Sequence, residues 1–213
     1  MSLAVSLVIP VFNEEATIER LMNTIREQTL QPAEIIFVDG GSTDKTVEKI
    51  RQQAAGNTRV IEAGRAMPGK GRNIGTENAA NSWIAYTDAG IELHKDWLKH
   101  LVNKAEGQSQ ADIVYGNFSP QADSFFEKCA AISYVPPGLP GKIRTKSIAS
   151  CLLKKDVWKK AGGFPDYRAA EDLIFMENAE KAGCTSMEAP EAMMCWQLRN
   201  TLGSTFKKFE LYS

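Results

Sequence analysis

Apolar runs of strand length alternate with amphipathic segments along the first half of the chain. The predicted strands cover residues 3–9, 34–38, 59–62 and 83–87. The predicted helices begin at a cap on Asn13, at a cap on Ser42 or Thr43, and within residues 64–71. Strands that alternate with helices of this length need right-handed crossovers. The pattern therefore predicts an α/β fold with a twisted, mainly parallel sheet covered by helices on both faces.

The second half of the chain is less regular. Its predicted elements are a helix around Trp97 and Leu101, a strand over 113–115, a strand over 148–153, a turn over 161–165 and a helix over 171–181. Residues 134–146 contain three prolines and two glycines, so this stretch is predicted to be an irregular, mobile loop. No repeat or low-complexity tract interrupts the chain, and residues 1–213 are predicted to form a single domain.

Composition limits the partners that we expect. The 213 residues are 43% hydrophobic and 24% charged, enough to bury a core. With 25 Lys and Arg against 26 Asp and Glu, no overall charge attracts nucleic acid or an anionic membrane, so no nucleic-acid partner is expected. The four scattered cysteines are interpreted as reduced thiols, and no apolar run reaches membrane-spanning length. We therefore expect a cytoplasmic protein.

Two aspartates stand at the ends of predicted strands. Asp39 follows the run 35–38 and Asp88 follows the run 83–87. In open α/β sheets, ligands bind at the carboxyl ends of the strands. Asp39 is placed to accept a hydrogen bond from uracil N3, which carries a proton, and guanine also offers donors. The alternatives are that Asp39 only caps the turn after it and that Asp88 only ends a strand.

A basic, glycine-rich turn leads into the third predicted helix. Residues 63–76 contain Arg65, Lys70 and Arg72 but no acid. Glycine-flanked backbone at a helix N-terminus can approach a diphosphate closely. The glycine spacing from Gly69 to Gly75 matches neither the dinucleotide pattern nor a Walker A loop. Lys70 and Arg72 are thus candidates for phosphate or nucleoside binding, and a solvated turn is the alternative.

As a set, these motifs resemble those of the family 2 glycosyltransferases of the GT-A fold. The motifs are the opening run Val8–Glu15, Asp39, Asp88, the turn Gly162-Gly163-Phe164 and the pair Glu171–Asp172. The resemblance covers residues 3 to about 199. It implies one Rossmann-like GT-A domain, in which residues 1–92 bind the nucleotide sugar and residues 93–213 bind the acceptor.

The resemblance also implies roles for single residues. Asp172 is expected to be the general base that takes the proton of the acceptor hydroxyl. Asp88 stands where the family carries its DxD motif and is expected to be the metal ligand. The residues expected to bind the donor are Pro10, Phe12, Glu14, Asp39, Lys70, Arg72, Asp88 and Arg199. On spacing alone, Glu171 and Asp172 are explained by their favourable interaction with a helix dipole.

Two motifs depart from the family pattern. The second acid of DxD is missing, because Asp88 is followed by Ala89 and Gly90. Mg²⁺ commonly takes one or two carboxylates and completes its shell with phosphate oxygens and water, so Mg²⁺ or Mn²⁺ is expected to bind weakly without nucleotide. The QxxRW motif of processive members is not matched at Gln197 and Arg199. This mismatch predicts the addition of one sugar per encounter.

The remaining basic and apolar residues bear on the acceptor. Six cations and no acid lie from Lys128 to Lys155, which suits an anionic acceptor, with a solvated face as the alternative. In the tail, Leu202, Phe206 and Phe209 stand near two lysines. They are predicted to dock on the core, and peripheral contact at the inner face of a membrane is the alternative.

The sequence thus predicts an inverting glycosyltransferase. It would move one sugar from a nucleotide diphosphate sugar, a UDP-sugar being favoured, to a hydroxyl of a saccharide or lipid-linked acceptor in polysaccharide, glycolipid or cell-envelope synthesis. One alternative is a non-catalytic nucleotide-sugar-binding module. The other is a sugar-phosphate nucleotidyltransferase, which would need a basic, glycine-rich loop where this chain has Pro10-Val11-Phe12-Asn13-Glu14.

Overall fold

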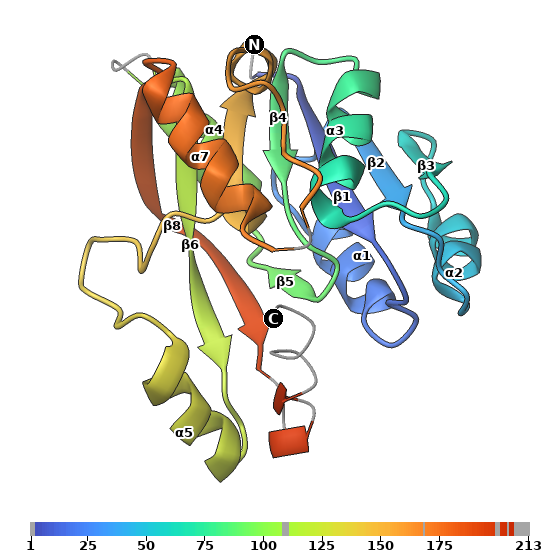
Figure 1. The fold of residues 1–213 in the computed structure, drawn as a ribbon, viewed down its shortest axis with the longest axis vertical. Helices are drawn as coiled ribbons and strands as arrows, with labels where there is room; N and C mark the ends of the chain where they lie inside the picture. Colours follow the sequence, from blue (N-terminus) through green and yellow to red (C-terminus); the bar gives the residue numbers. More distant parts are fainter. Residues whose placement is uncertain (1–2, 108–110, 168, 199–200, 204, 207–213) are drawn as a thin grey trace.

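Eight strands form one curled, mixed sheet (Figure 1). The computed structural model describes residues 3–107, 111–167, 169–198, 201–203 and 205–206, and within them the strand order is β3-β2-β1-β4-β7-β6-β8-β5. The strands are β1 (Val5–Val11), β2 (Glu34–Asp39), β3 (Thr58–Glu62), β4 (Trp83–Tyr86), β5 (Ile91–Leu93), β6 (Ile113–Gln121), β7 (Cys151–Lys154) and β8 (Ser186–Gln197). The strands from β3 to β4 are parallel, whereas β7 and β5 run antiparallel to their neighbours.

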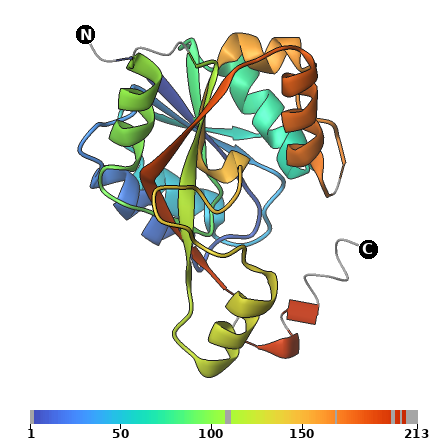
Figure 2. The same ribbon diagram turned by 90° about the vertical axis from the view of Figure 1, so that its left-hand side faces the viewer.

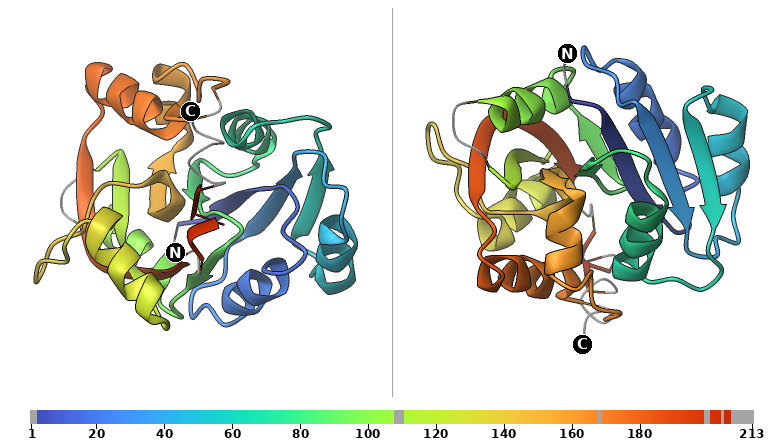
Figure 3. Two further views of the ribbon diagram at one scale, coloured as in Figure 1. Left: turned by 60° about the horizontal axis from the view of Figure 1, so that its bottom comes forward. Right: turned by 90° about the horizontal axis from the view of Figure 1, so that it is seen from above.

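Helices cover both faces of the sheet, as Figure 3 shows. The helices are α1 (Ile18–Arg26), α2 (Thr46–Gln53), α3 (Pro68–Asn78), α4 (Trp97–Glu106), α5 (Phe125–Tyr134), α6 (Lys155–Lys160) and α7 (Glu171–Lys181), with a 3₁₀ turn η1 (Ile148–Ser150). One core cluster contains residues of α1 and α4, and the other contains residues of α6 and α7. The predicted α/β fold with helices on both faces is confirmed.

β1 shows how the sequence produces this burial on two faces. Six of its seven residues are buried. Leu7 and Ile9 belong to the core cluster that includes α1, whereas Val8 belongs to the cluster that includes Phe175 of α7. Successive side chains of a strand point to opposite faces, so a strand covered on both sides needs an unbroken apolar run.

The predicted helix caps are wrong. Asn13 has φ 54° and lies outside α1, whose N-cap is Thr17. The N-cap of α2 is Lys45, not Ser42 or Thr43. By contrast, the predicted helix over 171–181 matches α7 at both ends.

The structure differs most from the prediction in the second half. The sequence pattern predicts no element at β5, α5, α6 or β8, and residues 148–150 form η1 where a strand is predicted. β8 contains Pro190, which argues against a strand interior. Pro190 lies in the part of β8 where its pairing with β6 shifts register, opposite Tyr115–Asn117. Such an irregularity tolerates proline.

The predicted docking of the tail on the core is wrong for the residues that the structure describes. Leu202 and Phe206 are 74% and 68% exposed. Phe209 lies outside the described residues.

β6 and β8 extend beyond the rest of the sheet and carry α5 near their far end (Figures 1 and 2). The proline-rich segment after α5 contains no helix or strand, as predicted. Arg144 holds this segment in place: its Nε donates to the Phe118 carbonyl (2.9 Å) and its Nη1 to the Pro136 carbonyl (2.6 Å).

Two glycines allow α3 to lie close to the sheet. Gly71 and Gly75 are four residues apart and share one helix face. A Cβ atom on Gly75 would lie 2.4 Å from Val8 Cγ1, and one on Gly71 would lie 3.1 Å from Pro10 Cβ. The glycine string of the sequence therefore serves helix–sheet packing, which brings the first turn of α3 to the carboxyl edge of the sheet.

We predict that Gly75→Ala destabilises the fold by about 1–3 kcal/mol, because the added methyl overpacks against the buried Val8. Helix propensity alone would favour alanine by about 1 kcal/mol, so the sign of the change tests the packing. Urea unfolding measures it. Gly56→Ala is the matched control, since its Cβ would meet nothing within 4 Å; equal effects of the two changes would contradict the close approach.

Candidate active site

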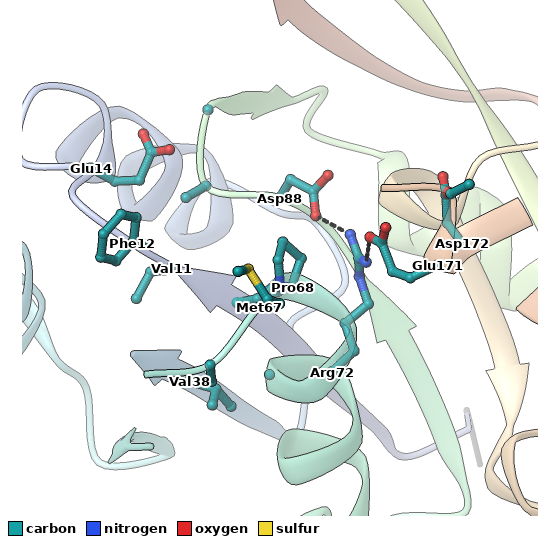
Figure 4. A pocket seen from close by; sticks show the side chains of 16 residues that line it. Val11, Phe12, Glu14, Val38, Met67, Pro68, Arg72, Asp88, Glu171 and Asp172 are labelled. Carbon is teal, nitrogen blue, oxygen red and sulfur yellow. Dashed lines mark hydrogen bonds and ion pairs between the residues drawn. The ribbon is translucent and has the colours of Figure 1, made fainter. Parts of the chain in front are cut away.

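A cleft of about 520 Å³ opens where strand ends of the sheet meet the N-termini of α3 and α7 (Figure 4). Its lining includes Pro10, Phe12, Glu14, Val38, Met67, Pro68, Gly71, Arg72, Asp88, Ala170, Glu171 and Asp172. Residues far apart in the chain thus converge at the edge of the sheet where ligands bind in open α/β folds.

Side-chain hydrogen bonds connect the loops that follow β1 and β2. Asn13 Oδ1 accepts from the backbone N–H of Thr43 (2.9 Å), and the Asn13 N–H donates to Ser42 Oγ (2.9 Å). These contacts explain the wrong cap predictions, because the polar atoms concerned join two loops instead of starting helices. They also fix the loop that presents Phe12, a residue that lines the cleft and is 57% exposed.

Asp39 ends β2, but its carboxylate turns into its own loop. Oδ2 accepts from the backbone N–H groups of Gly41 and Ser42 (both 3.1 Å), and the residue is 4% exposed. The structure thus gives Asp39 the turn-capping role, and Asp39 does not line the cleft. A carboxylate has about four acceptor sites, so Asp39 can still accept a further hydrogen bond. Its contact with the uracil of a donor stays a prediction.

Arg72 joins three elements through two ion pairs. From α3, its Nη1 donates to Glu171 Oε1 at the start of α7 and its Nη2 donates to Asp88 Oδ1 after β4, both at 2.8 Å (Figure 4). Its guanidinium carbon also lies 5.6 Å from the centre of the Phe164 ring. Arg72 and Glu171 are buried and Asp88 is half-buried, and the two ion pairs hold the three elements in register.

The charges of this group favour a cation nearby. Burial by itself would lower the pKa of Arg72, but the carboxylates of Asp88 and Glu171 outweigh it and raise that pKa. Arg72 therefore stays charged, and the three groups together carry one net negative charge. Asp88 is 43% exposed in its side chain, and its Oδ2 has no hydrogen-bond partner within the described residues. That oxygen is available to a ligand.

A second cavity, of about 460 Å³, adjoins the cleft. Asp88, Ala170 and Asp172 line both cavities. The other residues of the second cavity include Ile91, Phe118, Lys146, Ser147, Leu173, Met194 and Trp196. Asp172 accepts a hydrogen bond from the Leu173 N–H at Oδ1 (2.9 Å) and lies in the first turn of α7. Two carboxylates therefore stand where the cavities meet.

The turn before α7 is anchored to α3. Asn73 Oδ1 accepts from Trp158 Nε1 and from the Phe164 N–H (both 2.8 Å), and Asn73 Nδ2 donates to the Phe164 carbonyl (2.7 Å). Gly163 has φ 76°, a conformation that glycine adopts without strain. A Cβ atom there would lie 3.0 Å from Asn73 Oδ1. This glycine turn thus positions the N-terminus of α7.

Most of the predicted site residues converge. The predicted residues that line the cleft are Pro10, Phe12, Glu14, Arg72, Asp88 and Asp172. Asp39 and Lys70 do not line it; Lys70 is exposed on α3, and Arg199 lies outside the described residues. Sequence reasoning missed the role of Glu171 as the buried partner of Arg72. An acid at a helix start gives no signal of an ion pair across 99 residues.

A comparison with known proteins identifies the family. The family model described as Glycosyl transferase family 2 matches residues 6–151, more than half of the chain. The chain therefore belongs to glycosyl transferase family 2, the inverting transferases that its motifs resemble. The predicted class of enzyme is confirmed at this level.

Its relatives are longer than this chain. Glycosyltransferase AglE from Haloferax volcanii is 28% identical over an alignment of 216 positions, which covers 96% of this chain and 70% of AglE. Poly(ribitol-phosphate) beta-N-acetylglucosaminyltransferase TarS from Staphylococcus aureus is 30% identical over an alignment of 189 positions, which covers 82% of this chain but 32% of TarS.

Solved structures of S. aureus TarS match the fold. One has a TM-score of 0.71 at 20% identity and covers 98% of this chain and 38% of that chain. A second, in complex with UDP-GlcNAc, has a TM-score of 0.70 and covers 93% of this chain and 60% of that chain. The predicted GT-A fold is therefore confirmed.

The described residues lack two further features. Within them, no helix is both long and apolar enough to cross a membrane. Nor do they contain a group of three or more side chains suited to hold a metal ion.

We predict that Arg72→Met lowers the free energy of unfolding by about 3–5 kcal/mol, because it leaves the buried Glu171 carboxylate without its partner. Arg51→Met is the control. It breaks the pair with Glu62, in which both side chains are 58% exposed, and should cost less than about 1 kcal/mol. Denaturant unfolding compares them, and similar losses would show that Arg72 is not the structural link described.

Proposed function

We propose that the protein transfers one sugar from a nucleotide diphosphate sugar to a hydroxyl acceptor, and that transfer occurs between Asp88 and Asp172. The observation that carries this proposal is the junction of the two cavities at these carboxylates. A donor in the cleft and an acceptor in the second cavity would meet there, with residues 1–92 supplying most of the donor site and residues 93–213 most of the acceptor site.

A uridine diphosphate sugar is the proposed donor. Phe12 offers an exposed ring at the cleft on which a base can stack, with Pro10 and Glu14 beside it in the lining. Asp39 would accept the uracil N3 proton. The solved TarS complex with UDP-GlcNAc, in the same fold, supports this choice of base.

The diphosphate is proposed to lie at the first turn of α3. The backbone there and the net charge of Arg72 with its partners suit a diphosphate that brings its own cation. Lys70 would contact phosphate from the exposed side of α3. Arg199 completes the proposed donor set on the sequence resemblance alone.

Asp88 fits a divalent ion that is held mainly by the donor. Its Oδ1 is fixed by Arg72 and its Oδ2 faces no protein partner within the described chain, so it can supply one of the one or two carboxylates that Mg²⁺ takes. When bound, Mg²⁺ or Mn²⁺ would offset the charge that develops on the departing diphosphate. Family members generally use such a metal. Binding without nucleotide is expected to be weak.

Asp172 is the proposed general base. It would accept the proton of the acceptor hydroxyl as the hydroxyl oxygen bonds to the anomeric carbon and the diphosphate leaves from the opposite face, which inverts that carbon. A carboxylate is a weak base for an alcohol. When the leaving group departs early, the sugar becomes oxocarbenium-like and the attacking hydroxyl becomes acidic, so proton transfer to Asp172 can be late.

The acceptor is proposed to be a hydroxyl of a saccharide or of a lipid-linked glycan, in polysaccharide, glycolipid or cell-envelope synthesis. Phe118 and Trp196, whose rings meet edge to face at 6.1 Å, offer apolar surface in the second cavity, and Lys146 offers a charge. The four free cysteines support a reducing compartment, and we propose that the protein works in the cytoplasm, at the inner face of the membrane.

The alternatives now have less support. The loop after β1 is neither glycine-rich nor basic and is fixed to the β2 loop, so it does not suit a nucleotidyltransferase, and the family match points away from that class. The non-catalytic binding module remains distinguishable by experiment, because it requires donor binding without turnover.

UDP with Mg²⁺ or Mn²⁺ is predicted to raise the melting temperature by about 5–10 °C when the nucleotide is about a hundredfold above its Kd. Asp88→Asn keeps the shape of the side chain but removes its charge. This variant should therefore lose most of the metal-dependent part of the rise in melting temperature. Asp156→Asn, an exposed acid on α6, is the control. A shift that is the same with and without metal, in wild type and Asp88→Asn alike, would remove Asp88 from the donor site.

Asp172→Asn is predicted to bind UDP as wild type does but to release UDP from UDP-sugars at least about a hundredfold more slowly, because it cannot accept the proton. The measurement is UDP release from a panel of UDP-sugars with candidate saccharide acceptors, beside a thermal-shift titration with UDP. Glu177→Gln, one turn and a half further along α7, is the control. Unchanged turnover in Asp172→Asn would rule out the proposed base.

A further inference from the structure

A third cavity, of about 350 Å³, lies beyond the second cavity along α7. Thr145, Lys146 and Leu173 line both of them, so the two cavities adjoin each other. The volume of the third cavity falls within the range of about 300–1,000 Å³ that small-molecule sites have. The proposed transfer between Asp88 and Asp172 does not itself involve this cavity.

Two elements run from the second cavity into the third. On β6, Phe118 lines the second cavity and Tyr115 lines the third. On α7, the corresponding residues are Asp172 and Glu180. Glu180 follows Asp172 by eight positions, which is about 12 Å of helix at a rise of about 1.5 Å per residue. The two cavities therefore form one trough that begins at the proposed general base and follows α7, which is labelled in Figure 1.

The buried tyrosine of the third cavity has no hydrogen-bond partner in the described part of the protein. Tyr115 is 2% exposed, and its hydroxyl bonds to no described residue. Buried tyrosine hydroxyls usually find a partner, as the hydroxyl of Tyr86 does in Thr76. Burial raises the pKa of Tyr115, so its hydroxyl keeps the proton that it can donate. The unpaired hydroxyl thus marks a place for a polar group of a ligand.

Other polar side chains converge on the same cavity. Glu180 is exposed, and its carboxylate forms no ion pair or hydrogen bond within the described residues. Lys146 Nζ lies 5.5 Å from the centre of the Tyr115 ring and donates to Ser186 Oγ (3.3 Å). An ammonium has three N–H donors, so Lys146 can donate to a ligand as well. The cavity therefore offers both donors and acceptors at close range.

The charges of the third cavity nearly cancel. Lys146 and Glu180 are of opposite sign, and Glu177, at the rim, is 66% exposed and pairs with Lys181 (3.6 Å). Of the six cations from Lys128 to Lys155, Lys146 is the one that lines the second or the third cavity. A ligand with several hydroxyls and no net charge fits such walls, because each hydroxyl both donates and accepts.

We propose that the third cavity holds the sugar that precedes the acceptor residue, so that the protein extends a neutral saccharide chain of two or more residues. The sugar that carries the attacking hydroxyl would lie in the second cavity beside Asp172. Its neighbour in the chain would meet Tyr115, Lys146 and Glu180. This inference rests on the proposed function, because it takes Asp172 as the place of transfer. Binding energy from the remote sugar would help to orient the reacting one.

The test compares acceptors of increasing length. UDP release is measured with UDP-glucose, UDP-galactose and UDP-N-acetylglucosamine as donors, and with mono-, di- and trisaccharides of glucose, galactose and N-acetylglucosamine as acceptors. In at least one series we expect kcat/KM to rise at least about tenfold from the monosaccharide to the disaccharide, because a hydrogen bond to a charged group contributes about a factor of ten or more.

Two variants probe the third cavity. Tyr115→Phe removes only the hydroxyl, and Glu180→Gln removes only the charge. Each should lower the ratio of kcat/KM for the disaccharide to kcat/KM for the monosaccharide by at least about fivefold. Because Glu180 is exposed, Glu180→Gln should fold as wild type does even if Tyr115→Phe lowers the melting temperature. Glu191→Gln, an exposed acid of β8 outside both cavities, is the matched control and should keep the ratio.

The possible failures are distinguishable. Equal kcat/KM for mono- and disaccharides, or a ratio that neither variant changes, would overturn the saccharide site in the third cavity and leave the proposed transfer standing. A rate of UDP release that no saccharide increases would overturn the proposed transfer, on which this site rests. UDP binding, measured on the same proteins, shows separately whether the donor assignment fails.

Discussion

The architecture of the candidate site depends on one buried guanidinium shared by two carboxylates. Arg72 on α3 reaches Asp88 beyond β4 and Glu171 on α7, so a single side chain connects the early half of the chain to the late half. Charged groups taken out of water are costly unless their partners are close and well oriented. The pairing therefore restricts how α3, the β4 strand end and α7 can be placed relative to one another.

Backbone details make this pairing geometrically attainable. α3 can approach the sheet because Gly71 and Gly75 carry no side chain, and its first turn passes close to α7 at Gly69, where a Cβ would lie 2.7 Å from the Pro165 carbonyl. The turn at Gly163, bound to Asn73, sets the start of α7. As a result, Asp172 and Asp88 both stand at the boundary of the two cavities. Asp172 is fixed by the Leu173 backbone N–H, and Asp88 is fixed by Arg72.

The sequence predicts the parallel half of the fold and most of the cleft, because both depend on local signals. Apolar runs give the strands, and an acid such as Asp88 after a run is carried to the edge of the sheet by topology alone. The linking role of Asn13 could not be predicted, since the hydrogen bond that it accepts from the Thr43 N–H depends on which loops become neighbours.

Long-range pairing accounts for the other misses. The buried role of Glu171 depends on Arg72, a partner 99 residues away. β8 is not predicted because Pro190 argues against a strand, and the irregular pairing with β6 that accommodates this proline gives no signal in the sequence. For Glu171 and β8, the deciding contact is made only once the sheet has formed. Asp39 is different, because its carboxylate accepts from the backbone N–H of Ser42 in its own turn, which is the local alternative that the sequence offers.

We propose that the donor diphosphate and its cation meet Asp88 while Arg72 keeps that carboxylate in place. A crystal structure of the protein with UDP and Mn²⁺, with the metal located by its anomalous scattering, tests it most directly. We expect Mn²⁺ to be bound at Asp88 together with the nucleotide, with the Arg72–Asp88 and Arg72–Glu171 pairs intact. A nucleotide bound outside the cleft, or Arg72 released from both carboxylates to hold the phosphates, would contradict it.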